Sequence, residues 1–119
     1  MKAPNMNNQY ECLKLQANGI VRFAVSAEIV YLEANDNYTK LVLNDRSKFT
    51  VCKTLLNFEA LFGFQFFRCH KSYLVNPLYV KEIDKRSHCL LLTTGEKIPF
   101  PRDKNKILEE MIQNKQLIR

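Results

Sequence analysis

The chain has 119 residues, of which 46% are hydrophobic and 25% charged, and these values are typical of one globular domain. Its formal net charge of +6 fits a negatively charged partner, although an ordinary solvated basic surface explains the same excess. No apolar run approaches the length of a membrane helix, and the first residues lack the apolar core of a signal peptide. We therefore expect a cytoplasmic protein without a membrane partner.

The cysteines and histidines do not form a recognisable site. Cys12, Cys52, Cys69 and Cys89 contain no C-x-x-C pair, and their spacing is not that of a zinc site. In a reducing compartment we expect them to be small buried or half-buried residues. Cys69 and His70 are adjacent, and adjacent strand residues point to opposite faces, which is a poor geometry for a nucleophile and its base. We expect no enzyme, metal site or cofactor.

Most of the chain is patterned as short strands. Residues 1–9 are polar and are interpreted as a disordered lead or linker stump, and residues 10–115 as one domain. Alternating or apolar runs predict strands near residues 10–17, 20–25, 29–34, 38–43, 49–51, 66–67, 80–83, 89–92 and 97–98. Asn18 and Gly19 indicate a tight turn between the first two. The connections are too short for crossover helices, so we expect antiparallel pairing.

Two segments have helical spacing instead. Apolar residues recur every three or four positions over 55–62, Thr54 is a suitable N-cap, and Gly63 is a stop signal. A last helix is expected to begin near Pro101 or Arg102. Its apolar face comprises Ile107, Leu108, Met111 and Ile112. The predicted fold class is mainly β with two short helices.

The segment 31–41 carries the first group of polar side chains. Asn35, Asp36 and Asn37 tolerate the left-handed backbone of a tight turn, and Lys40 follows on the outgoing strand. A loop that presents amide, hydroxyl and ammonium groups together can hold phosphate and contact base edges. On local grounds alone, an ordinary hairpin turn is the simpler interpretation.

The segment 66–77 carries the second group. His70, Lys71 and Ser72 are consecutive polar residues flanked on both sides by apolar ones. The apolar flanks would anchor the segment and leave a polar tip outside. All three side chains can donate to phosphate, and Lys71 can also donate to a base edge.

The segment 97–104 carries the third group. Arg102 lies where a strand ends and a helix begins, and its guanidinium can fork onto the O6 and N7 atoms of guanine. Lys104 and Lys106 follow closely and can meet phosphate. An Arg paired with Asp103 or a glutamate at a helix start is the alternative.

The order and spacing of the three segments together resemble the LytTR domain, the DNA-binding half of many bacterial LytR–AlgR-type response regulators of two-component systems. The resemblance runs from about Ile20 to Ile112. Its matching positions are the turn motif 31–38, the helix 54–61, and Phe66, His70, Lys71, Ser72, Val75, Asn76, Gly95, Phe100, Pro101 and Arg102.

The resemblance implies an elongated β-β-β arrangement of ten strands whose edge loops enter successive major grooves of duplex DNA. Carried over by position, the residues facing base edges would be Thr39, Lys71 and Arg102. The residues holding the phosphate backbone would be Asn37, Tyr38, Lys40, His70 and Ser72, with Lys104 added from its place beside Arg102. Glu33, Val75 and Asn76 would be structural.

The resemblance also implies partners, and the sequence departs from the family pattern at two positions. DNA sites of this family are often paired repeats, which suggests a homodimer on DNA. A receiver domain or other input module would lie outside this chain. Lys71 stands where the family usually has Arg, which loses a bidentate fork. Pro101 stands where Ser is usual, which removes a hydroxyl and a backbone N–H.

A protein-interaction or single-strand nucleic-acid-binding β module is the alternative function. In that case exposed tyrosines would stack on bases, the candidates being Tyr31, Tyr38, Tyr73 and Tyr79. Half-buried strand tyrosines are the simpler interpretation of the same residues.

Overall fold

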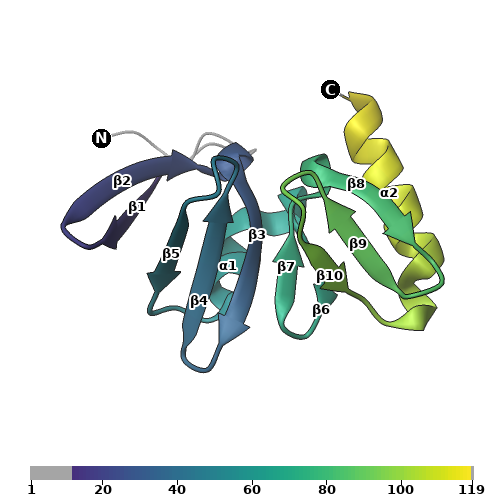
Figure 1. Ribbon diagram of the computed structural model, residues 1–119, viewed down its shortest axis with the longest axis horizontal. Coiled ribbons are helices and arrows are strands. Elements are labelled where there is room, and N and C mark those ends of the chain that lie inside the picture. Colours follow the sequence, from purple (N-terminus) through teal and green to yellow (C-terminus); the bar gives the residue numbers. More distant parts are fainter. Residues whose placement is uncertain (1–11, 119) are drawn as a thin grey trace.

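The computed structural model describes the backbone of residues 12–118, together with all of their side chains except 64, 107 and 115–118 (Figure 1). This part of the chain contains ten strands, grouped in three antiparallel sheets, and two α-helices. The predicted mainly β fold is confirmed. The lead predicted for residues 1–9 lies outside the described residues.

A two-stranded ribbon comes first. It pairs β1 (Cys12–Ala17) with β2 (Ile20–Val25). Asn18 and Gly19 join the strands with φ angles of 52° and 79°, so both adopt the left-handed backbone that a two-residue hairpin turn requires. The tight turn predicted at these residues is therefore confirmed.

A five-stranded sheet forms the centre of the molecule, in the order β5-β4-β3-β7-β6. Its strands are β3 (Ile29–Asn35), β4 (Tyr38–Leu43), β5 (Lys48–Val51), β6 (Phe67–His70) and β7 (Tyr73–Val75). Strand β3 pairs with β4, its neighbour in sequence, and on its other side with β7 from much later in the chain. This second pairing brings two distant hairpins into one sheet.

The central sheet is buried on both faces. In β4, Leu41 and Leu43 belong to a cluster with α1 and the ribbon, whereas Val42 belongs to a cluster with the third sheet and α2. All three side chains are fully buried. Two-sided burial explains why the second half of this strand, residues 41–43, is a continuous apolar run.

The third sheet has the order β10-β9-β8 and packs with the C-terminal helix (Figure 1). Its strands are β8 (Val80–Asp84), β9 (Cys89–Leu92) and β10 (Lys97–Pro99). Leu108 and Ile112 of α2 (Asn105–Ile118) are buried in the same cluster as Leu90 and Ile98. The predicted apolar face is thus found, except that the side chain of Ile107 lies outside the described part.

The helix boundaries follow the predicted signals with one difference. In α1 (Leu55–Phe62), the Thr54 hydroxyl accepts a hydrogen bond from the Asn57 backbone N–H, and Gly63 follows the last turn with a φ of 60°. A 3₁₀ turn (Arg102–Lys104) precedes α2, so the α-helix starts slightly later than predicted. The other 3₁₀ turns are Ser26–Glu28, Gly63–Gln65 and Pro77–Tyr79. None of the helices described here is long and apolar enough to cross a membrane.

The cysteines occupy different environments. Cys69 is buried and Cys89 half-buried, as predicted, but Cys12 and Cys52 are exposed. The prediction was wrong for these two because Cys12 lies on the outward face of the two-stranded ribbon and Cys52 in the loop after β5.

Candidate nucleic-acid interface

The first tip is the hairpin turn between β3 and β4. Asn35 pairs with Tyr38 across it, and Asp36 adopts a left-handed φ of 56°. Asn37 and Tyr38 are exposed at this tip, and Tyr38 retains 46% of its accessible surface. The tip therefore presents an amide and a phenol to the outside.

Thr39, two residues beyond Asn37, is placed differently from the expectation. Its relative exposure is 0%, and its hydroxyl donates a 2.6 Å hydrogen bond to the backbone carbonyl of Lys53. The hydroxyl thus ties β4 to the loop that follows β5. A side chain with no exposed surface cannot reach a base edge, so Thr39 is removed from the expected base contacts.

Lys40 lies behind the tip and is already paired. Its ammonium is 3.0 Å from a carboxylate oxygen of Glu33, the residue directly opposite on β3. The second carboxylate oxygen of Glu33 accepts a 3.1 Å hydrogen bond from the Tyr73 hydroxyl. Burial, and then Glu33, raise the pKa of Tyr73. Glu33 is therefore structural, as expected, and it offsets much of the charge of Lys40.

The second tip is the turn between β6 and β7. His70 pairs with Tyr73, so Lys71 and Ser72 form a two-residue turn. The backbone N–H of Ser72 donates a 3.0 Å hydrogen bond to Nδ1 of His70. In a neutral imidazole this leaves the proton, and hence a donor, on Nε2. Lys71 is exposed at the turn, and His70 and Ser72 are half-buried beside it.

Arg68, which was not among the residues predicted from the sequence, supports this second tip. Its guanidinium donates to the backbone carbonyls of His70 and Lys71 and also contacts the Glu59 carboxylate. The available signal was its position two residues before His70, which places both side chains on the same face of a strand. Asn76, in contrast, is structural as expected, because its amide donates to the Ile29 carbonyl.

The first two tips lie at the same end of the central sheet. Glu33 of β3 pairs with Tyr73 of β7, and the backbone N–H of Ala34 donates a 2.8 Å hydrogen bond to the Ser72 carbonyl. Figure 1 shows both turns at the lower end of this sheet. Polar groups that are more than thirty residues apart in sequence are therefore brought together.

The third tip is the turn Arg102–Lys104 between β10 and α2. Arg102 is exposed and Lys104 half-buried. The thiol of Cys69 in β6 lies 3.9 Å from the Pro99 carbonyl, so β10 leads to this turn from beside the second tip. Burial raises the pKa of Cys69 to about 12, and the nearby positive charges of Lys104 and Arg68 partly oppose this. The turn also lies in the lower part of Figure 1.

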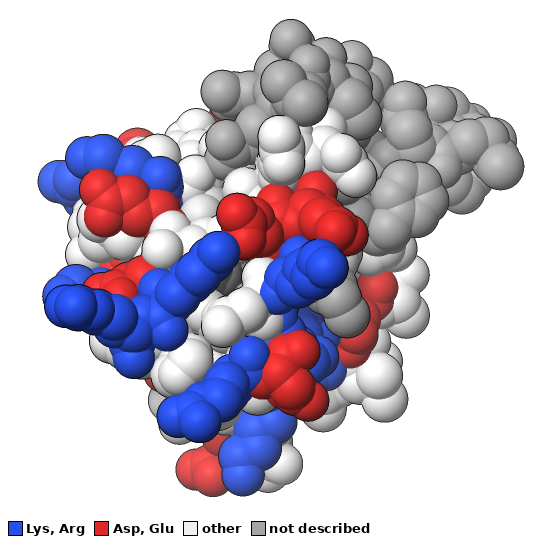
Figure 2. All heavy atoms as spheres, turned by 90° about the vertical axis from the view of Figure 1, so that its right-hand side faces the viewer, with Lys and Arg blue, Asp and Glu red and all other residues white. Residues whose placement is uncertain are grey.

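At the end of the molecule that carries the third sheet and α2, the basic charge is not collected in one patch. Figure 2 shows the end of the molecule that carries the third sheet and α2, where Lys and Arg side chains are interspersed with Asp and Glu. Lys85, for example, is paired with Glu109 at 2.9 Å. Affinity for a polyanion at this end must therefore depend on particular unpaired side chains, not on a broad basic surface.

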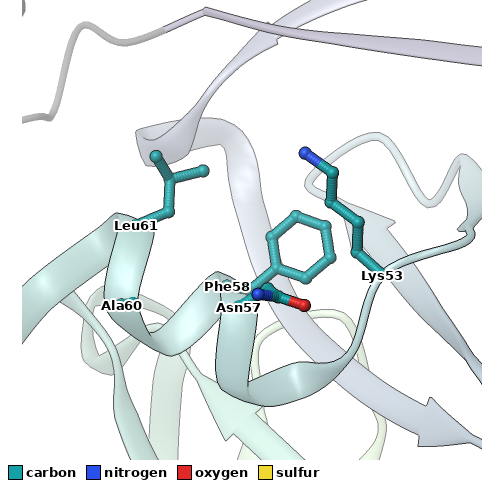
Figure 3. A pocket seen from close by; sticks show the side chains of 5 residues that line it. All are labelled: Lys53, Asn57, Phe58, Ala60 and Leu61. Carbon is teal, nitrogen blue, oxygen red and sulfur yellow. The ribbon is translucent and has the colours of Figure 1, made fainter.

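A shallow hollow beside α1 shares no lining residue with the three tips (Figure 3). It is lined by Lys53, Asn57, Phe58, Ala60 and Leu61. Among the described residues, no three His, Cys, Asp or Glu side chains lie close enough together to hold a metal ion. Apart from buried Thr39 and ion-paired Lys40, the polar side chains predicted to contact DNA lie at the three tips.

Comparison with known proteins identifies the family. The model of the LytTR DNA-binding domain matches residues 20–113. This chain belongs to the LytTR family. The match spans the central sheet, the third sheet and all three tips.

Similarity to two individual proteins agrees with this assignment. The chain is 33% identical over 89 residues to the sensory transduction protein LytT of Bacillus subtilis (strain 168). The aligned region covers 71% of this chain but 36% of LytT. The chain thus spans about a third of the length of that relative. It is also similar to a solved LytTR DNA-binding domain from Bacillus cereus, with a TM-score of 0.73 and 25% identity over 85% of this chain and 95% of that one.

Proposed function

We propose that this LytTR domain binds duplex DNA sequence-specifically to regulate transcription, with its three tips entering successive major grooves. The observation that carries the proposal is that the first two tips lie side by side at one end of the central sheet, with β10 leading to the third from beside the second. The molecule extends 43 Å along its longest axis, which is more than the roughly 34 Å repeat of the duplex.

Within this proposal the side chains have separate tasks. Lys71 and Arg102, both exposed, face base edges, and Asn37 takes the base-facing place at the first tip that Thr39 cannot fill. The phosphate backbone is held by Tyr38, His70, Ser72 and Lys104. Lys40 contributes less, since its charge is shared with Glu33.

The wider setting is also a proposal. We place the DNA-binding domain over residues 10–115. Because the aligned region covers 36% of LytT, we propose that the domain belongs to a longer cytoplasmic regulator, in which a receiver domain or other input module controls it. Paired repeat sites would let two copies bind as a dimer on DNA. We propose a binding role without a catalytic step, because the candidate side chains are distributed over three separate turns.

The single-strand alternative has little support from the tyrosines. Tyr31 is buried, Tyr73 and Tyr79 are half-buried, and the Tyr79 hydroxyl donates a 2.5 Å hydrogen bond to the Ala27 carbonyl. Of the four candidates, Tyr38 alone is freely available for stacking. A row of stacked bases needs more than one such ring.

Duplex binding across a salt series, measured by fluorescence anisotropy, tests the proposal. A site selected from a randomised duplex pool is compared with the unselected pool and with single-stranded DNA. We expect the selected duplex to bind far more tightly than both, with an affinity that falls steeply as salt rises. Equal affinity for selected and unselected duplexes, or a preference for single strands, would contradict it.

A further inference from the structure

Arg68 occupies a central position behind the second tip. Its Nε donates to the His70 carbonyl at 3.1 Å, and one terminal nitrogen donates to the Lys71 carbonyl at 2.7 Å. The other terminal nitrogen is 2.7 Å from a carboxylate oxygen of Glu59 in α1. One guanidinium thus connects a helix to two consecutive carbonyls of the turn.

These bonds complete a set that restrains the whole turn. The N–H of Ser72 is bound to the His70 ring, and the Ser72 carbonyl accepts from Ala34 of β3. With Arg68 on the carbonyls of His70 and Lys71, the backbone from 70 to 72 is held from α1 and from the neighbouring strand. The exposed Lys71 side chain is then presented from a fixed backbone.

The guanidinium also changes the electrostatics of the tip. Backbone carbonyl oxygens repel phosphate oxygens, because both are hydrogen-bond acceptors with partial negative charge. Arg68 donates to two such carbonyls at the tip, and the planar fork of Arg suits this double donation whereas an ammonium does not. Glu59 holds the guanidinium in place, with side-chain exposures of 30% for Arg68 and 38% for Glu59.

We infer that Arg68, anchored by Glu59, is a positioning residue for DNA recognition: it sets the backbone of the 70–72 turn so that His70 and Lys71 reach the duplex. The inference rests on the proposed function and deepens it. Arg68 acts on the DNA through its neighbours and need not touch it.

Two substitutions in the full chain separate this role from simple charge. Arg68→Lys keeps the charge and loses the fork, and we expect it to weaken binding of the selected duplex roughly tenfold. Binding of the unselected pool at the same salt concentration should be nearly unchanged. Glu59→Gln adds one unit of net positive charge, which favours all duplexes, yet we expect the ratio of specific to non-specific affinity to fall.

The matched control is Arg22, whose guanidinium lies 2.6 Å from Asp45 and also contacts Ser47. Asp45 and Ser47 lie in the turn after β4, at the opposite end of that strand from the first tip. We expect Arg22→Lys to alter the melting temperature as Arg68→Lys does, while leaving the specificity ratio at its wild-type value. A merely structural Arg68 would make the two variants behave alike.

The outcomes distinguish the positioning role of Arg68 from the proposed DNA-binding function on which it rests. Amide hydrogen exchange, measured without DNA, should be faster at residues 70–72 in Arg68→Lys than in the wild type. If the wild type prefers its selected duplex and Arg68→Lys retains the same specificity ratio, the inference is overturned and the proposed function stands. If the wild type prefers no duplex, the proposed function fails first.

Discussion

The backbone N–H of Ala34 donates a 2.8 Å hydrogen bond to the carbonyl of Ser72, and this contact joins the first tip to the second. Because the two residues belong to different hairpins, the relative position of the tips is set by sheet pairing. Substitutions at one tip can therefore be interpreted without assuming that the other has moved.

Replacing Arg102 with Ala should reduce specific binding more than non-specific binding. Its exposed guanidinium is proposed to contact a guanine edge, and a good bidentate pair is worth roughly 1–3 kcal/mol of discrimination. Anisotropy with selected and unselected duplexes at one salt concentration measures both losses. Lys48→Ala, which removes the same charge from an exposed position of β5, is the control. An equal loss for both duplexes would refute base contact by Arg102.

Replacing Lys71 with Arg should change the preferred site. A guanidinium can fork onto guanine where an ammonium makes a single point contact, so we expect one position of the site to become enriched in guanine. Parallel selections from one randomised pool, with wild type and variant, measure this. Identical selected sites would argue that Lys71 contacts only the backbone.

Replacing Thr39 with Val should affect stability and leave recognition unchanged. The variant keeps the shape of the side chain but leaves the Lys53 carbonyl without its donor, at a cost of about 1–3 kcal/mol. Urea unfolding measures the loss, and anisotropy well below the melting temperature should show wild-type affinity. Lost specificity with unchanged stability would restore Thr39 as a DNA contact.

Replacing Glu33 with Gln should strengthen binding to every duplex. The change releases Lys40 from its 3.0 Å ion pair and removes a negative charge behind the first tip, which we propose to face DNA. We expect the slope of log affinity against log salt to become steeper by about 1. Glu82→Gln, the same charge change at an exposed position of β8, should have a smaller effect. Equal effects from the two variants would exclude a local role for Lys40.

Cys69 should resist thiol reagents in the native protein. Burial raises its pKa to about 12, so at pH 8 the thiol is protonated as well as inaccessible, and only the thiolate is nucleophilic. Mass spectrometry after a short maleimide treatment should find Cys12 and Cys52 modified and Cys69 modified only after denaturation. Labelling of native Cys69 at the rate of Cys52 would show that the core opens readily.

Local features were predictable from the sequence because nearby residues determine them. The Asn18-Gly19 turn follows from the tolerance of these two residues for positive φ, and α1 follows from its apolar spacing between Thr54 and Gly63. The first two polar tips stood out because each interrupts apolar strands that must be buried, and the third because it lies where a strand gives way to a helix. The resemblance of their order to the LytTR pattern then gave the family, which the match over residues 20–113 confirmed.

Tertiary structure alone decided which of these polar side chains are available. Thr39 lies beside exposed Tyr38 in sequence, yet it is buried because a distant carbonyl, that of Lys53, meets its hydroxyl. Arg68 appears as an ordinary strand arginine until α1 supplies Glu59 and the turn supplies two carbonyls. Strand alternation gives the face of a residue, but the groups opposite that face come from remote parts of the chain. The positions of those groups depend on the pairing of β3 with β7 and on the packing of α1, which no short stretch of sequence encodes.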